Sequence, residues 1–198
     1  AGQHSDYVVT EAGFGADMGA ERFFDIKCPV GGLRPDCAVI VTTVRALKSH
    51  SGKYRLAPGK PLPDAMTEEN VEEIRTGSSN LLKHIEIVRG FGLNPVVAVN
   101  VFPTDHEAEL AEIEKICAEG ARELAREVAA ACKESTDAQI RPLYEDSDSL
   151  EDKIAKVAAM YGASGVDYTP AAAKRLKEYQ AAGFGSLKVV VAKTPMSL

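Results

Sequence analysis

Four short runs of apolar, largely β-branched residues alternate with longer stretches of helical character along this 198-residue chain. The runs cover residues 7–10, 38–44, 96–99 and 189–192. They are apolar along their whole length rather than at every second position, which is typical of strands buried on both faces of a sheet. Strands that alternate with helices predict a largely parallel β-sheet flanked by helices, the α/β class.

The stretches between these runs predict three helices with recognisable ends. One covers Thr67 to Phe91 and is closed by Gly92. A second covers residues 107–133 and is opened by Thr104 and Glu107, which have the spacing of a capping box. The third begins at Thr169 and Pro170 and ends at Gly183. Two irregular segments, residues 49–64 and 134–149, separate the helices.

The chain is long enough to bury a core in one domain or slightly more. We expect a central α/β domain over residues 1–133, which carries the nucleotide or anion site. Residues 134–198 then form a helical segment and the final strand of the same core, or the start of a further domain.

Composition excludes several classes of protein. The net charge of -6 argues against broad binding to nucleic acid or to acidic membranes. Four scattered cysteines without a C-x-x-C pair predict reduced thiols, and the four histidines lack metal-ligand spacing, so we assign no metal site. No apolar run approaches the roughly 20 residues that span a bilayer, and the N-terminus has no basic, apolar leader. We therefore expect a cytoplasmic protein.

Three glycines follow the first apolar run, with the spacing G-x-G-x-x-x-G at Gly13, Gly15 and Gly19. Glycine permits backbone angles closed to other residues, and the N-terminus of a following helix would direct N–H groups at an anion. The spacing matches neither the dinucleotide fingerprint nor a Walker A loop. By itself the pattern fits an anion site and a plain tight turn equally well.

Ligands of parallel sheets gather at the carboxyl ends of the strands, where further polar side chains stand. Arg45 and Lys48 place two cations three residues apart after the second run, which suits an oxygen-rich anion or a solvated basic turn. After the third run, Asn100 could read a base or hold a turn, and Phe102 could stack on a planar ring or fill the core. Asp17 and Asp105 fit capping and turn roles as well as a charge in the site.

Three blocks in this order resemble formate–tetrahydrofolate ligases. They are TEAGFGADMGAERFFDIKC at residues 10–28, PDCAVIVTTVRALK at 35–48 and PVVAVNVFPTD at 95–105. Residues 161–166, 183–185 and 191–194 are also similar to the family, so the resemblance covers almost the whole chain. It implies a P-loop NTPase-like core without its N-terminal P-loop unit.

The resemblance also implies an activity. Family members use ATP and Mg²⁺ to phosphorylate formate, and N10 of tetrahydrofolate then attacks formyl phosphate, giving 10-formyltetrahydrofolate. The partners are then small molecules, and the complete enzyme is expected to be a homo-oligomer. Catalysis of this kind depends on positioning and charge neutralisation, so it needs no catalytic triad.

Carried over residue by residue, the resemblance assigns the site. The phosphate and formyl group would lie against Glu11, Gly13, Gly15, Ala16, Asp17 and Gly19. The nucleotide would lie against Asn100, Phe102 and Pro103. The catalytic role expected for Arg45 and Lys48 rests on their charge and placement.

The chain departs from the family pattern in three ways. It contains no G-x-x-x-x-G-K-[ST] sequence, it stops soon after Lys193, and Ile116-Cys117 runs on where the family has a further strand and a glycine-rich turn. We therefore expect a central piece of the ligase that is inactive by itself and binds no cofactor tightly. The alternative is a non-catalytic nucleotide- or anion-binding module, or an assembly element.

Overall fold

The computed structural model describes residues 7–57, 59–118 and 140–191. The chain divides into two compact units. Unit 1 consists of residues 1–33 and 142–198, and unit 2 consists of residues 34–141. The expected domain boundary near residue 133 stays a prediction.

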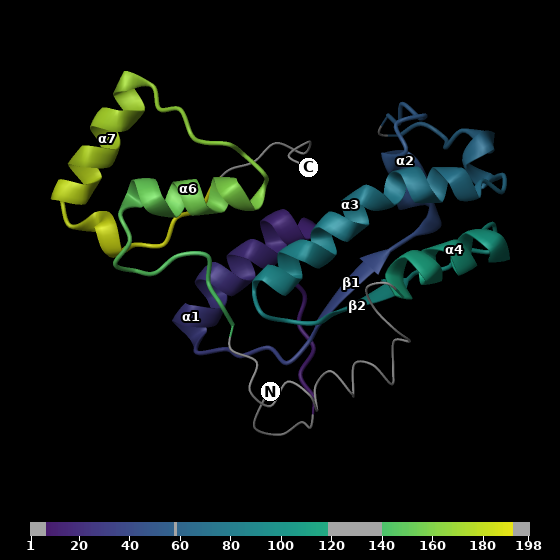
Figure 1. The fold of residues 1–198 in the computed structure, drawn as a ribbon, viewed down its shortest axis with the longest axis horizontal. Coiled ribbons are helices and arrows are strands. Elements are labelled where there is room, and N and C mark those ends of the chain that lie inside the picture. Colours follow the sequence, from purple (N-terminus) through teal and green to yellow (C-terminus); the bar gives the residue numbers. More distant parts are fainter. Residues whose placement is uncertain (1–6, 58, 119–139, 192–198) are drawn as a thin grey trace. The chain divides into compact units, whose positions relative to one another are not determined.

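Unit 2 contains a two-stranded parallel sheet. Strand β1 (Ala38–Thr42) pairs with strand β2 (Pro95–Val99), with Ala38 opposite Pro95 and Thr42 opposite Val99. The two strands lie side by side in Figure 1. The α/β class and the parallel pairing are therefore confirmed, and both strands end at the same edge of the sheet.

In the described part of unit 2, the sheet is accompanied by the helices α2 (Val44–His50), α3 (Val71–Gly90) and α4 (Glu107–Ala118) and by the 3₁₀ turn η3 (Asp64–Thr67). The Thr43 hydroxyl caps α2 by accepting from the Ala46 amide, and the Asn70 side chain caps α3 by accepting from the Glu73 amide. Gly92 follows α3 with a φ of 90°, as its role of helix terminator predicts. The remainder of the helix expected over residues 107–133 lies outside the described residues.

The core of unit 2 lies between the helices and one face of the sheet. Its buried members come from α2, α3 and α4, and the sheet adds Ile40, Val97 and Val99. On the other face Val39 and Val41 are 49% and 67% exposed. The expectation that the strands are buried on both faces is thus wrong for β1, because the described helices cover only one side of a sheet of two strands.

Helices α2 and α3 cross closely at Gly77. A Cβ atom at this position would lie 1.8 Å from the Leu47 carbonyl oxygen, which is far inside van der Waals contact. The absence of a side chain therefore fixes how near α2 lies to α3.

Unit 1 is mainly helical in its described part. Residues 15–31 form two wide-turn helical segments, η1 (Gly15–Ala20) and η2 (Phe23–Lys27), followed by α1 (Cys28–Gly31). Later in the chain come α6 (Leu150–Met160), α7 (Pro170–Ala181) and the short turn η4 (Phe184–Ser186). Thr169 caps α7 and Gly183 follows it with a φ of 87°, so both predicted ends of this helix are confirmed.

The two remaining predicted strands are wrong where the structure describes them. Residues 7–10 are exposed and residues 189–191 are irregular. Side chains bind the backbone of the second segment, since Tyr144 contacts both the amide and the carbonyl of Val189, and Arg22 donates to the Val191 carbonyl. A strand needs a neighbouring strand for these groups, and here the side chains take that place.

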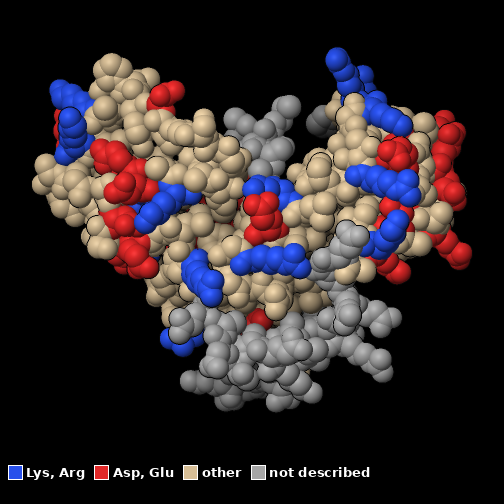
Figure 2. All heavy atoms as spheres, viewed as in Figure 1, with Lys and Arg blue, Asp and Glu red and all other residues tan. Residues whose placement is uncertain are grey.

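Within the described ranges, no helix is both long enough and apolar enough to cross a membrane. On the face shown in Figure 2, Lys and Arg side chains are interspersed with Asp and Glu over α3 and α4. One such group joins Arg75 to Glu112 and Glu72 at 2.8 and 3.3 Å. Exposed pairs of this kind contribute little to stability.

Candidate functional site

The Arg45 guanidinium lies at the carboxyl edge of the sheet, over the turn that follows β2. Its central carbon is 4.5 Å from the centre of the Phe102 ring, and Nη2 donates to the Thr104 hydroxyl at 2.8 Å. The Nε atom is buried and has no hydrogen-bond partner among the described residues. Arg45 is therefore held in place by a ring and a hydroxyl while it keeps donors for an anion.

The turn after β2 is itself fixed by hydrogen bonds. The Asp105 carboxylate accepts from the Phe102 amide at 2.8 Å, and the Asn100 amide donates to the Thr42 carbonyl at 2.9 Å. Asp105 thus has the turn role that the sequence left open. The side chains of Asn100 and Pro103 are exposed, whereas the Phe102 ring is partly buried beneath Arg45.

The expected capping box of Thr104 and Glu107 is wrong, because Thr104 has another partner. The Thr104 hydroxyl accepts a hydrogen bond from Arg45 instead of from an amide of α4. The His106 amide donates to the Glu109 carboxylate at 3.4 Å, and the His106 carbonyl accepts from the Glu109 and Leu110 amides. Helix α4 still begins at the predicted residue, Glu107, three positions beyond the Thr104 hydroxyl that contacts Arg45.

Lys48 lies in the interior of unit 2. Its side chain is 1% exposed, and its ammonium group is 2.5 Å from the Glu109 carboxylate. It also donates to the carbonyls of Met66 and Glu68 at 3.1 and 2.6 Å. An ammonium group has three protons, so these three acceptors use all of its donors.

Glu109 collects donors from three elements. Besides Lys48 of α2, it accepts from the Asn70 amide at the start of α3 at 2.8 Å and from the His106 amide at the start of α4. His106 also contacts the Thr67 carbonyl at 2.9 Å through its Nε2 atom. The buried carboxylate therefore joins α2 and the start of α3 to the beginning of α4.

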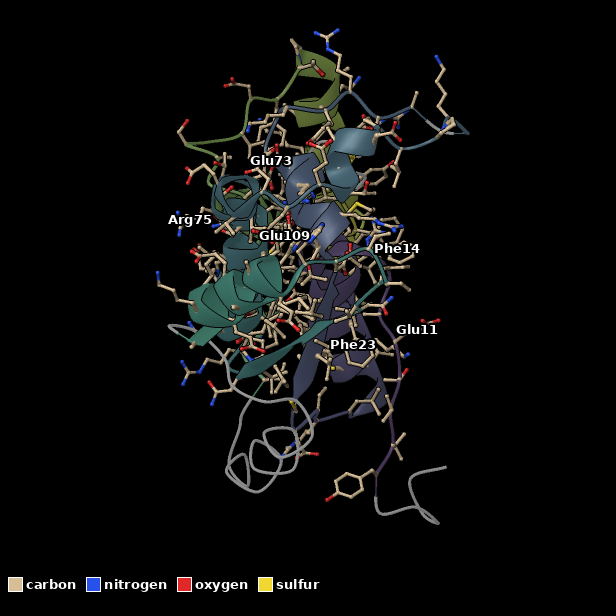
Figure 3. The ribbon with its side chains drawn as sticks, turned by 90° about the vertical axis from the view of Figure 1, so that its right-hand side faces the viewer. Glu11, Phe14, Phe23, Glu73, Arg75 and Glu109 are labelled. Atoms are coloured by element: carbon tan, nitrogen blue, oxygen red, sulfur yellow. The ribbon has the colours of Figure 1, made fainter. Side chains whose placement is uncertain are left out.

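A second buried carboxylate, that of Glu73, holds the loop after α2. It accepts from the Tyr54 hydroxyl at 2.9 and 3.1 Å and from Asn70, and it pairs with Lys53 at 3.2 Å. Burial and this hydrogen bond raise the pKa of Tyr54 above its ordinary value. Figure 3 shows Glu73 and Glu109 among the helices of unit 2, whereas Arg75 projects outward.

The glycine segment lies in unit 1. Gly15 has a φ of 77°, which a side chain would disfavour. A Cβ atom on Gly19 would lie 1.6 Å from the Gly13 carbonyl oxygen, so these glycines allow the backbone to approach itself. The close approach gives the glycines a packing role, and it leaves their predicted contact with phosphate or formyl untested.

The other residues predicted to border the phosphate and formyl group differ in exposure. Glu11 is exposed and Ala16 is partly buried, whereas Asp17 is only 6% exposed. The Asp17 carbonyl accepts a short hydrogen bond from the Tyr161 hydroxyl, which ties the segment to the end of α6. Phe14 is 99% exposed and stands beside the N-terminal segment in Figure 3.

Sequence reasoning missed several buried charges that organise both units. They include Glu73 and Glu109 in unit 2 and Glu21, Asp25 and Lys153 in unit 1, each 3% exposed or less. For Glu109 and Lys153, the spacing of neighbouring apolar residues in the sequence could have indicated burial. Glu109 recurs with the buried Ile113 and Cys117, and Lys153 with Leu150 and Val157, at helical spacing on an apolar face.

Over the ranges that the structure describes, no group of three or more His, Cys, Asp or Glu side chains is placed to hold a metal ion. The cysteines at 28, 37 and 117 are free thiols, and burial raises the pKa of Cys28 and Cys117. Cys132 lies outside the described residues. In unit 2, Arg45 places a cation above the Phe102 ring.

Comparison with known proteins agrees with the resemblance seen in the sequence. The family model for formate–tetrahydrofolate ligase matches residues 1–198. A formate–tetrahydrofolate ligase of Cutibacterium acnes is 52% identical over 98% of this chain, and one of Saccharopolyspora erythraea is 51% identical over all of it. A ligase of Rubrobacter xylanophilus is 44% identical over 98% of the chain.

The match covers only part of each relative. This chain spans 37% of the C. acnes ligase and 38% of the S. erythraea ligase. The second match extends over 215 positions against 198 residues here, so the relative has residues with no counterpart in this chain. The segment that the sequence predicts to be missing after Cys117 could account for some of these residues. Because the family model matches all 198 residues, the chain belongs to the formate–tetrahydrofolate ligase family.

Proposed function

We propose that this chain forms part of the active-site region of a formate–tetrahydrofolate ligase. The complete enzyme would use ATP to phosphorylate formate and would pass the formyl group to tetrahydrofolate, giving 10-formyltetrahydrofolate. Family membership and the identity of about half the residues with named ligases support this activity.

One observation carries the proposal beyond family membership. Arg45 lies over Phe102 and is bonded to Thr104, with a buried Nε donor that has no partner in the described part of the chain. A guanidinium fixed in this way is preorganised for a phosphate or formyl phosphate group, because it loses little freedom when the anion binds. Asn100 and Pro103 are exposed on the turn that contains Phe102. A planar ring of the nucleotide would bind against this turn.

The proposal also assigns the glycine segment of unit 1. Glu11, Gly13, Gly15, Ala16, Asp17 and Gly19 would border the phosphate and formyl group in the complete enzyme. The left-handed φ of Gly15 supports this role, since it turns the backbone where a side chain would be disfavoured. Without a Walker A lysine in its sequence, the 198-residue chain by itself is expected to be inactive.

Arg45→Ala tests the anion site directly. Loss of a charge-assisted donor should weaken phosphate or ATP binding by about 1.5–3 kcal/mol. Chemical-shift titration of the isotope-labelled chain with phosphate or ATP measures this even when binding is weak. Lys53→Ala, which removes a cation that is 56% exposed, is the control and should bind as the parent does.

Two results would contradict the assignment. The first is equal binding by Arg45→Ala, Lys53→Ala and the parent chain. The second is a titration that moves signals in unit 2 without moving those of Arg45, Phe102 or Thr104. Either result would return Arg45 to the role of a surface cation on a basic turn.

A second candidate function is a non-catalytic nucleotide- or anion-binding module. The buried Arg45 Nε donor without a partner among the described residues favours it as the alternative, because it could hold an anion without any catalytic step. The two functions separate in one assay, in which the chain is mixed with the portions of the C. acnes ligase that it lacks. Formation of 10-formyltetrahydrofolate supports the ligase, and saturable ATP binding without product supports the module.

A further inference from the structure

Lys48 and Arg45 stand three residues apart on α2 but have different surroundings. Arg45 is partly exposed at the edge of the sheet, and Lys48 is fully buried with all three of its protons on acceptors. A lysine without a free proton has no donor to offer a ligand. Any effect of Lys48 on the candidate site must therefore come from the positions of the residues to which it is hydrogen-bonded.

The residues that Lys48 holds lead back to the candidate site. Arg45 reaches Thr104 in the turn after β2, and Lys48 reaches Glu109 five residues further along the chain. Glu109 also fixes the entry to α4 through the His106 amide. Helix α2 is thus tied at two points to the chain that follows β2: an exposed contact to Thr104 in the turn and a buried contact to Glu109 in the first turn of α4.

The energetic character of the buried pair supports a geometric role. Removing two charges from water costs several kcal/mol, and well-packed apolar residues often replace such pairs without loss of stability. A hydrogen-bonded ion pair, by contrast, fixes the direction and separation of its partners more closely than apolar contact does. The pair is therefore suited to holding α2 at a defined distance from the Phe102–Thr104 turn.

We propose that the Lys48–Glu109 pair is a positioning device that sets the Arg45 guanidinium over the Phe102 ring. This inference rests on the proposed function for its relevance to catalysis, but the placement itself is a property of the chain. Lys48 and Glu109 are then positioning residues, and Arg45 is the group that meets the anion.

The test measures the placement without any ligand. In the parent chain the Phe102 ring should shift the Arg45 Nε–H signal upfield, and Phe102→Leu gives the value without the ring. The double variant Lys48→Met/Glu109→Leu replaces the pair by apolar side chains of similar length, so neither charge is left buried without its partner. We expect it to lose most of the upfield shift, and hydrogen exchange at the amides of α3 verifies its fold.

Two further variants sharpen the result. Lys153→Met removes a lysine of equal burial from unit 1 and should leave the Arg45 signal unchanged. Glu109→Asp keeps both charges but shortens the carboxylate side chain, so it should give an intermediate shift; it decides the question if the double variant does not fold. A folded double variant, or failing that Glu109→Asp, with the parent shift would overturn the inference.

Phosphate titration of the same samples separates this inference from the proposed function. Weaker binding by both Arg45→Ala and the double variant supports the two together. If Arg45→Ala binds phosphate as the parent does while the double variant loses the ring shift, the positioning inference stands and the anion site fails. If Arg45→Ala alone weakens binding and the double variant keeps the shift, the reverse holds.

Discussion

Among the described residues, each unit of this protein has one completely buried lysine, and the two lysines are stabilised differently. Lys48 of unit 2 has one carboxylate and two carbonyls as acceptors. Lys153 of unit 1 donates to three carbonyls, those of Asp146, Gly185 and Leu187, at 2.7–3.1 Å. Both ammonium groups use three donors, but of these described acceptors only the Glu109 carboxylate at Lys48 is an anion.

This difference shows what each lysine organises. Lys48 joins regular elements, since it connects α2 with α4 through a side chain at each end. Lys153, on the first turn of α6, binds the backbone of η4 at Gly185 and that of the residue after η4, Leu187, and the Tyr144 ring lies 5.8 Å from its ammonium group. A carboxylate partner fixes two helices, whereas carbonyl partners fix the path of a loop.

Removal of Lys48 should have the largest effect on stability. Lys48→Met leaves the Glu109 carboxylate buried without its cation, which typically costs about 3–5 kcal/mol. Native-state hydrogen exchange of the α2, α3 and α4 amides measures the change within unit 2. Lys53→Met is the control, and a loss no larger than that of this exposed lysine would show that Glu109 needs no cation.

Lys153→Met should have a smaller effect, confined to unit 1. It leaves carbonyl groups without donors, at about 1–3 kcal/mol in total when they are partly rehydrated. Exchange at the α6 amides and at residues 185–187 is the measurement. The comparison between the two lysines is reversed if Lys153→Met destabilises its unit more than Lys48→Met does.

Tyr144 gives the smallest of these effects and adds a dependence on pH. Burial raises the pKa of Tyr144 from its ordinary value of 10.0 to about 12. Its protonated form is therefore favoured in the folded unit, and this stability is present below pH 10 and lost as the pH rises towards 12.

Tyr144→Phe should remove that loss between pH 10 and 12, and should itself cost about 0.5–1.5 kcal/mol through the missing contacts with Val189. Absorbance of tyrosinate follows the titration while circular dichroism follows unfolding. An unchanged alkaline transition in Tyr144→Phe would assign it to another group.

Several features could be predicted from local sequence because their causes are local. The ends of α7 follow from the Thr169 cap and from Gly183, and the pairing of β1 with β2 follows from apolar runs separated by helices. The family could be predicted from motif identity. The position of Arg45 and Phe102 after two strands placed them at one sheet edge, and the structure brings them within 4.5 Å.

Features that depend on neighbours distant in the sequence could not be predicted in this way. Lys48 and Lys53 look alike in sequence, but one is buried against Glu109 and the other is 56% exposed. Residues 7–10 and 189–191 have strand composition, yet they do not form strands here because a strand exists only through a paired neighbour. The sequence by itself determined the family, the class and the local caps, and the tertiary structure decided which charges are buried, because burial and pairing depend on contacts between segments far apart in the chain.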